Sequence, residues 1–71
     1  MKLTPRQTQV THLLLEGAST KAIADSLNIS FHTAKFHIRA LFNKLEVDRR
    51  GQIVVAALRA GLIQLHAPVQ T

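Results

Sequence analysis

Hydrophobic residues recur three and four positions apart along most of the chain, and this spacing predicts helices. The first helix begins with Thr4 as N-cap, Pro5 at the first helical position and Gln7 completing a capping box, and we expect it to reach about Glu16. Gly17 suits the left-handed position that ends such a helix. Because the chain has no alternating strand pattern, the sequence predicts an all-α fold.

A short turn separates the second predicted helix from the third. Ser19 caps a helix expected over residues 20–27, and Ser30 caps one expected over residues 31–45. Asn28 can adopt the left-handed conformation between them. The turn is about three residues long, which is the spacing of a helix-turn-helix, so residues 31–45 are predicted to be its recognition helix.

A fourth helix is expected after residue 47. Asp48 is the first candidate for its N-cap and Arg49 the second, and the apolar pattern continues to Ala60. Gly61 ends the helix, and the apolar residues that follow can pack back against it. The sequence thus predicts four helices.

The predicted third helix divides into three sectors when residues are placed about 100° apart. The apolar sector, expected to face the core, contains Ala34, Ile38, Leu41 and Leu45. The opposite sector, expected to face outward, contains Lys35, Arg39, His32, Asn43 and Phe36. The flank, where a helix lying in a DNA groove meets a phosphate strand, contains Thr33, His37 and Lys44.

Charge favours a polyanionic partner. The chain has 71 residues with nine Lys and Arg against four Asp and Glu, a formal charge of +5, and a pI of about 10.9. Within residues 30–50 lie five of the nine cations: Lys35, Arg39, Lys44, Arg49 and Arg50. Arg and Lys can donate to guanine, and Phe36 can lie against a thymine methyl. The alternatives are a solvated basic face and a Phe36 that caps the core or contacts another copy.

The length of the chain and its residue types narrow the class of protein to which it can belong. Residues 1–63 are expected to form one domain and residues 64–71 a flexible tail. The chain lacks cysteine, so it has no disulfide framework, and no apolar run approaches the length of a membrane span or follows the N-terminus as a signal peptide. We therefore expect a cytoplasmic protein without a membrane partner.

Catalytic and metal-binding constellations are missing from the sequence. The acidic residues are scattered over helix ends and pair with no plausible catalytic histidine. His32 and His37 lie about 140° apart around their helix, so the two imidazoles cannot bind one metal ion. We expect no enzymatic activity, no cofactor, no metal and no small-molecule ligand.

A series of short motifs runs through the chain in a fixed order: Leu3-Thr4-Pro5-Arg6, Glu16-Gly17, Lys21-x-Ile23-Ala24, Ile29-Ser30, Thr33-x-Lys35-x-His37 and Lys44-Leu45-x-Val47. Together they resemble the LuxR-type, or GerE-like, output domain of bacterial transcriptional regulators of the NarL/FixJ class. The resemblance covers about residues 3–63. It implies a four-helix domain whose third helix enters the major groove of double-stranded DNA.

The resemblance also implies roles for individual residues. Base contacts fall on Lys35, Phe36 and Arg39. Phosphate contacts fall on Thr20, Lys21, Ser30, Thr33, His37 and Lys44. A homodimer on a pseudo-palindromic site, with half-sites about one helical turn apart, would pair through exposed positions of the fourth helix: Gln52, Val55, Ala56 and Arg59. RNA polymerase is a further candidate partner.

The sequence departs from the family pattern at several positions. Gln7 and Gln9 replace glutamates, one of which often pairs with the arginine matching Arg50, so any such link here would use a neutral acceptor. Thr11 replaces a usual leucine and makes that part of the core lighter. Glu46 replaces a frequent glycine, at a cost of about 1 kcal/mol in a left-handed cap.

Two other readings share the predicted fold. In the first, the domain is a protein-interaction or anti-activator module, and the presence of Lys35 and Arg39 argues against it. In the second, it resembles region four of a sigma factor, and the Thr33-x-Lys35-x-His37 pattern favours the LuxR type instead. Phe36 stands where a smaller residue is common, which leaves the base preference open.

Overall fold

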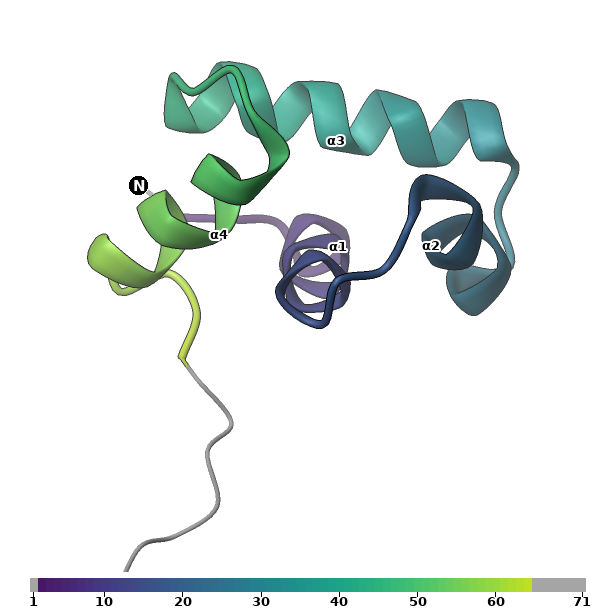
Figure 1. The fold of residues 1–71 in the computed structure, drawn as a ribbon, viewed down its shortest axis with the longest axis horizontal. Coiled ribbons are helices and arrows are strands. Elements are labelled where there is room, and N and C mark those ends of the chain that lie inside the picture. Colours follow the sequence, from purple (N-terminus) through teal and green to yellow (C-terminus); the bar gives the residue numbers. More distant parts are fainter. Residues whose placement is uncertain (1, 65–71) are drawn as a thin grey trace, which may run out of the picture.

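The computed structural model describes residues 2–64 and is entirely helical there, without strands (Figure 1). The predicted tail, residues 64–71, lies outside the described residues except for Gln64. Four helices follow one another: α1 (Pro5–Leu15), α2 (Thr20–Leu27), α3 (Phe31–Leu45) and α4 (Arg50–Arg59). The predicted all-α architecture is confirmed, and α1 and α4 each end one residue earlier than expected.

Side-chain caps begin the first three helices as predicted. The Gln7 backbone N–H donates to Thr4 Oγ1 at 3.1 Å, and the Thr4 N–H donates to Gln7 Oε1 at 2.9 Å, which completes the capping box. Ser19 and Ser30 each accept a bond from the backbone N–H three residues later, at 3.1 and 3.0 Å. These bonds satisfy amide groups that have no partner inside the helix.

The start of α4 differs from the first expectation. Arg49, not Asp48, is the N-cap, and its side chain forms no capping hydrogen bond. The Gln52 side chain reaches back past the cap and accepts the Asp48 N–H at 3.3 Å, so it engages the residue before the cap. Asp48 is therefore one position too early to cap the helix, and α4 begins without a side-chain cap.

The four helices end in the same way, with a left-handed residue. These residues and their φ angles are Gly17 (82°), Asn28 (56°), Glu46 (57°) and Gly61 (72°). After each, the next N–H donates to the carbonyl five residues back, at 2.9 to 3.1 Å, as in a Schellman motif. Each of the four expected left-handed positions is confirmed, including Glu46, which has a Cβ where glycine would be unstrained.

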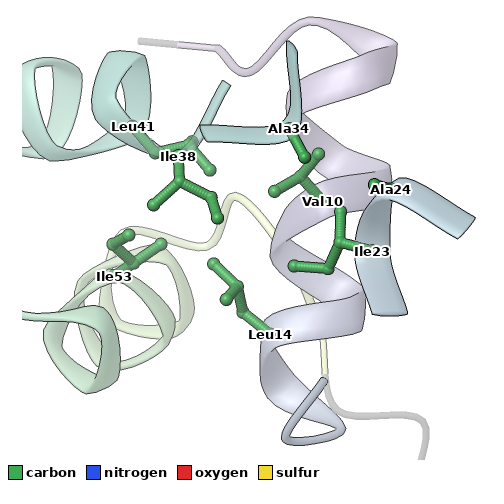
Figure 2. Packing of buried hydrophobic residues seen from close by; sticks show 8 residues of the cluster. All are labelled: Val10, Leu14, Ile23, Ala24, Ala34, Ile38, Leu41 and Ile53. Atoms are coloured by element: carbon green, nitrogen blue, oxygen red, sulfur yellow. The ribbon is translucent and has the colours of Figure 1, made fainter. Parts of the chain in front are cut away.

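Side chains from all four helices form the core (Figure 2). Its buried members are Val10, Leu14, Ile23, Ala24, Ala34, Ile38, Leu41 and Ile53. Helix α1 packs against each of the other three helices. After α4 the chain folds back, and Ile63 is 5% exposed.

Thr11 occupies a fully buried position on α1. Its hydroxyl donates to the Gln7 carbonyl at 2.8 Å. The polar group is therefore satisfied within its own helix. This position contributes less apolar packing than a leucine would.

Helix α3 lies along one side of the domain, with the other three helices all on its inner side (Figure 1). Residues 28–30 connect it to α2, as the helix-turn-helix spacing requires. One face of α3 is thus held against the core while the opposite face is open.

Candidate nucleic-acid interface

The three predicted sectors of α3 differ in burial as expected. On the inward sector Ala34, Ile38 and Leu41 are at most 5% exposed, and Leu45 is half-buried against the core. All five outward residues are exposed: His32, Lys35, Phe36, Arg39 and Asn43. All three flank residues are half-buried: Thr33, His37 and Lys44. The outward face of α3 is therefore exposed and cationic, and the flank beside it is half-buried.

The candidate base-contacting residues lie close together on the outward face. Lys35, Phe36 and Arg39 line one open hollow, together with His32. Phe36 is 66% exposed, and its ring meets His37 edge-on with centroids 5.9 Å apart. The hollow combines an apolar surface with cationic donors, which is the chemistry of a surface that reads base edges.

Phe31 was not identified from the sequence as part of this face. It is the first residue of α3 and is 53% exposed. The Lys35 ammonium lies 5.8 Å from the centroid of its ring, a cation–π arrangement. The four-residue spacing of the pair was the available signal, because side chains at i and i+4 meet on a helix.

Two of the three flank residues, Thr33 and Lys44, form hydrogen bonds with neighbouring polar groups. The Ser30 hydroxyl donates to Thr33 Oγ1 at 2.9 Å while it caps the helix. The Lys44 ammonium donates to Gln7 Oε1, across 37 residues of sequence, at 3.2 Å. Since Gln7 is neutral, this bond does not pair Lys44 with a negative charge.

The remaining candidates for phosphate contacts begin α2. Thr20 is half-buried and Lys21 is exposed. Lys21 forms an ion pair with Asp25 at 3.4 Å, and both side chains are more than two-thirds exposed at 79% and 71%. Such an exposed pair is weak, so Asp25 does not prevent Lys21 from meeting a phosphate.

Arg50 links the beginning of α4 to the beginning of α2. Its Nη1 donates to Thr20 Oγ1 at 2.8 Å, and its Nη2 donates to the Ala18 carbonyl at 2.9 Å. Arg50 forms no link to a glutamine of α1, because these two acceptors engage the guanidinium and Gln7 accepts from Lys44 instead. Arg50 and Thr20 also share a hollow with Lys35 and Arg39, which places a further cation beside the outward face.

The candidate dimer residues lie together on the outer side of α4. Gln52, Val55, Ala56 and Arg59 line one shallow hollow, with Val47, Arg49 and Gly51 completing it. Val55 is 47% exposed although it is apolar. The surface is small and mixed in character, with an apolar centre and arginines at its edges.

Two further properties concern residues 2–64 as a group. None of their helices combines the length and apolar character that a membrane crossing needs. Nor do they contain a cluster of three or more histidine and acidic side chains able to hold a metal ion.

Known proteins resemble this chain in sequence and in fold. The family described as "Bacterial regulatory proteins, luxR family" matches residues 1–57. The spore germination protein GerE of Bacillus subtilis (strain 168) is 43% identical over 63 residues, which are 89% of this chain and 85% of that protein. A solved structure of the transcription factor GerE superposes with a TM-score of 0.81 at 37% identity, covering 87% of this chain and 92% of that one.

Longer regulators contain a similar region. The response regulator VraR of Staphylococcus aureus (strain Mu3) is 37% identical over 62 residues, which are 87% of this chain and 30% of that protein. The crystal structure of ChrA, a response regulator of a heme-sensing two-component system, superposes with a TM-score of 0.83 at 34% identity, covering 86% of this chain and 30% of that one. The chain therefore belongs to the luxR family of bacterial regulatory proteins and is a DNA-binding domain of a transcription regulator.

Proposed function

We propose that two copies of this chain bind a pseudo-palindromic site in double-stranded DNA, with half-sites about one helical turn apart. Helix α3 lies in the major groove of each half-site. Base edges are contacted by Lys35, Phe36 and Arg39. The observation that carries this proposal is the open outward face of α3, where these three side chains are exposed beside one another on the helix that follows the tight turn.

Phosphate strands meet the domain on both sides of this face. The proposed contacts are Thr20, Lys21, Ser30, Thr33, His37 and Lys44. We add Arg50, because its guanidinium holds the Thr20 hydroxyl and forms no ion pair with any of residues 2–64. Its charge is thus available to a phosphate next to Thr20.

The two copies pair through the outer side of α4. Gln52, Val55, Ala56 and Arg59 supply the contact, and the exposed Val55 lies at its centre. Seven residues line this hollow, against about 20 to 30 residues a side in the interfaces that hold stable dimers together. We therefore expect pairing on DNA, where both copies are already held side by side, and monomers in its absence.

In vitro selection from a random duplex library tests the proposal directly. We expect an enriched motif with two inverted half-sites about one helical turn apart, and a complex with two protein copies by sedimentation of the protein with the selected duplex. Val55→Glu places a charge in the centre of the α4 surface and is expected to favour the complex with one copy, without changing the preferred half-site.

Selection without any enriched motif would contradict the proposal. If the protein at low salt also bound no duplex in a gel-shift titration, an interaction module on the same fold would take the place of a DNA reader. A single half-site in the enriched motif would instead overturn only the pairing.

The proposal also states which residues form the domain, where it acts and which protein it contacts. Residues 1–63 form the DNA-binding unit, and it acts in the cytoplasm, where bacterial DNA is located. RNA polymerase is the partner that a bound regulator would contact. No enzymatic step is part of this proposal.

A further inference from the structure

We infer that the hollow on the outward face of α3 takes the 5-methyl group of a pyrimidine in DNA, in the base pair next to a guanine contacted by Arg39. The inference rests on the proposed function and adds the chemical group that the site reads. Thymine carries this methyl group in ordinary DNA, and 5-methylcytosine carries it in methylated DNA.

The walls of the hollow suit a methyl group. It has a volume of about 120 Å³ and is lined by His32, Lys35, Phe36 and Arg39. The Phe36 ring is 66% exposed, and its edge-on contact with His37 helps to fix its orientation. A phenyl ring in this position gains free energy when a methyl group covers it, and phenylalanine is among the side chains that read the thymine methyl in the major groove.

The charge around the hollow selects DNA as its occupant over an apolar segment of a protein. Lys35 and Arg39 lie at its rim, and neither forms an ion pair with any of residues 2–64. An apolar peptide would leave both cations without acceptors, whereas a major groove offers base acceptors beside each pyrimidine methyl.

The spacing of Phe36 and Arg39 makes the two base contacts neighbours. Three residues along a helix correspond to a rise of about 4.5 Å, comparable with the rise of about 3.4 Å per base step along a strand. Arg39 can donate to O6 and N7 of a guanine, and the methyl group of the adjoining pyrimidine then lies beside Phe36. The hollow is therefore expected to recognise the methyl group of a pyrimidine that adjoins a guanine.

Deoxyuridine substitution removes the methyl group and nothing else. A fluorescent duplex carrying the selected site is compared by anisotropy with duplexes in which each thymine in turn is replaced by deoxyuridine. At one position per half-site the wild-type chain should lose about fourfold in affinity, equivalent to about 0.8 kcal/mol for one buried carbon. The Phe36→Ala chain should bind both duplexes equally.

Phe31→Ala is the matched control. It removes another exposed phenyl ring from the same helix, outside the lining of the hollow, and with it the cation–π contact to Lys35. We expect affinity for the thymine and deoxyuridine duplexes to fall by the same factor. This variant should keep the fourfold preference for thymine. We expect both variants to fold, since neither ring is part of the core. Circular dichroism checks this expectation.

Cytosine and 5-methylcytosine at the sensitive position identify the source of the methyl group. A fourfold gain on methylation shows that the methyl group is read on either pyrimidine. Equal binding of the two, with thymine still preferred over deoxyuridine, restricts the reading to thymine.

The inference is overturned if the wild-type chain binds every deoxyuridine duplex as tightly as its parent and still prefers the selected site to a scrambled one. In that case the proposed function stands. An equal loss in the wild-type and Phe36→Ala chains also overturns it, because the methyl group then contacts another residue. If the protein does not distinguish the selected site from the scrambled one, the proposed function itself fails.

Discussion

The inward and outward faces of α3 differ in what holds their side chains in place. On the inward face Ala34 and Leu41 are fully buried and Ile38 is 5% exposed, so neighbouring helices fix each side chain. On the outward face Phe36 is 66% exposed, and its ring lies edge-on to the adjacent His37. One helix therefore contains a face whose residues decide stability and a face whose residues are free to decide binding.

This separation means that residues on the outward face can change without loss of the fold. Cationic and aromatic side chains there have few contacts with the core, so substitution should alter DNA affinity and leave unfolding almost unchanged. Substitution on the inward face should do the reverse. The following predictions test that separation, from the largest expected effect to the smallest.

Leu41→Ala should destabilise the domain by about 2 to 5 kcal/mol, because it leaves a cavity at a fully buried position. Urea unfolding followed by circular dichroism measures the change. Phe36→Ala, on the same helix but exposed, is the control and should change stability by less than about 0.5 kcal/mol. Comparable losses in the two variants would show that the two faces are not separate.

Arg39→Ala should weaken binding to the selected site by about 1 to 3 kcal/mol and relax its sequence preference, because a donor to a base edge is lost. Anisotropy titrations against the selected site and single-base variants measure both effects. The midpoint of urea unfolding should not move. A uniform loss over all sequences, with their ranking unchanged, would assign Arg39 to the phosphate backbone instead.

Glu46→Gly should stabilise the domain by about 1 kcal/mol, because it relieves a non-glycine residue with φ of 57° at the end of α3. Glu46→Ala is the matched control, since it loses the same carboxylate but keeps a Cβ. If both variants are stabilised equally, the gain comes from charge and not from the backbone.

Lys44→Ala should have the smallest effect, about 1 kcal/mol or less at moderate salt. We expect weaker binding to all duplexes alike and a salt dependence whose slope falls by about one, as for the loss of one phosphate contact. Lys2→Ala, at an exposed position outside the proposed DNA contacts, should leave the slope unchanged. If the unfolding midpoint falls and the slope stays unchanged, Lys44 stabilises the fold through its bond with Gln7 and contacts no phosphate.

The local features of the fold could be predicted from the sequence because they depend on residues a few positions apart. The capping box of Thr4 and Gln7 and the left-handed Gly17 were both identified in this way. The sectors of α3 followed from helical periodicity for the same reason. For the N-cap of α4 the preference for Asp48 over Arg49 was wrong, because the two candidates are adjacent and Asp48 lies one residue before the observed cap.

Contacts between helices were decided only by the tertiary structure. Arg50 donates to Thr20 and the Ala18 carbonyl, 30 and 32 residues away, and Lys44 donates to Gln7 across 37 residues. No short-range pattern specifies which acceptor a long cationic side chain reaches, because that choice depends on how the helices pack. The sequence by itself thus determined the four helices, the left-handed residues that follow them and the outward sector of α3, whereas packing decided which polar groups support that sector.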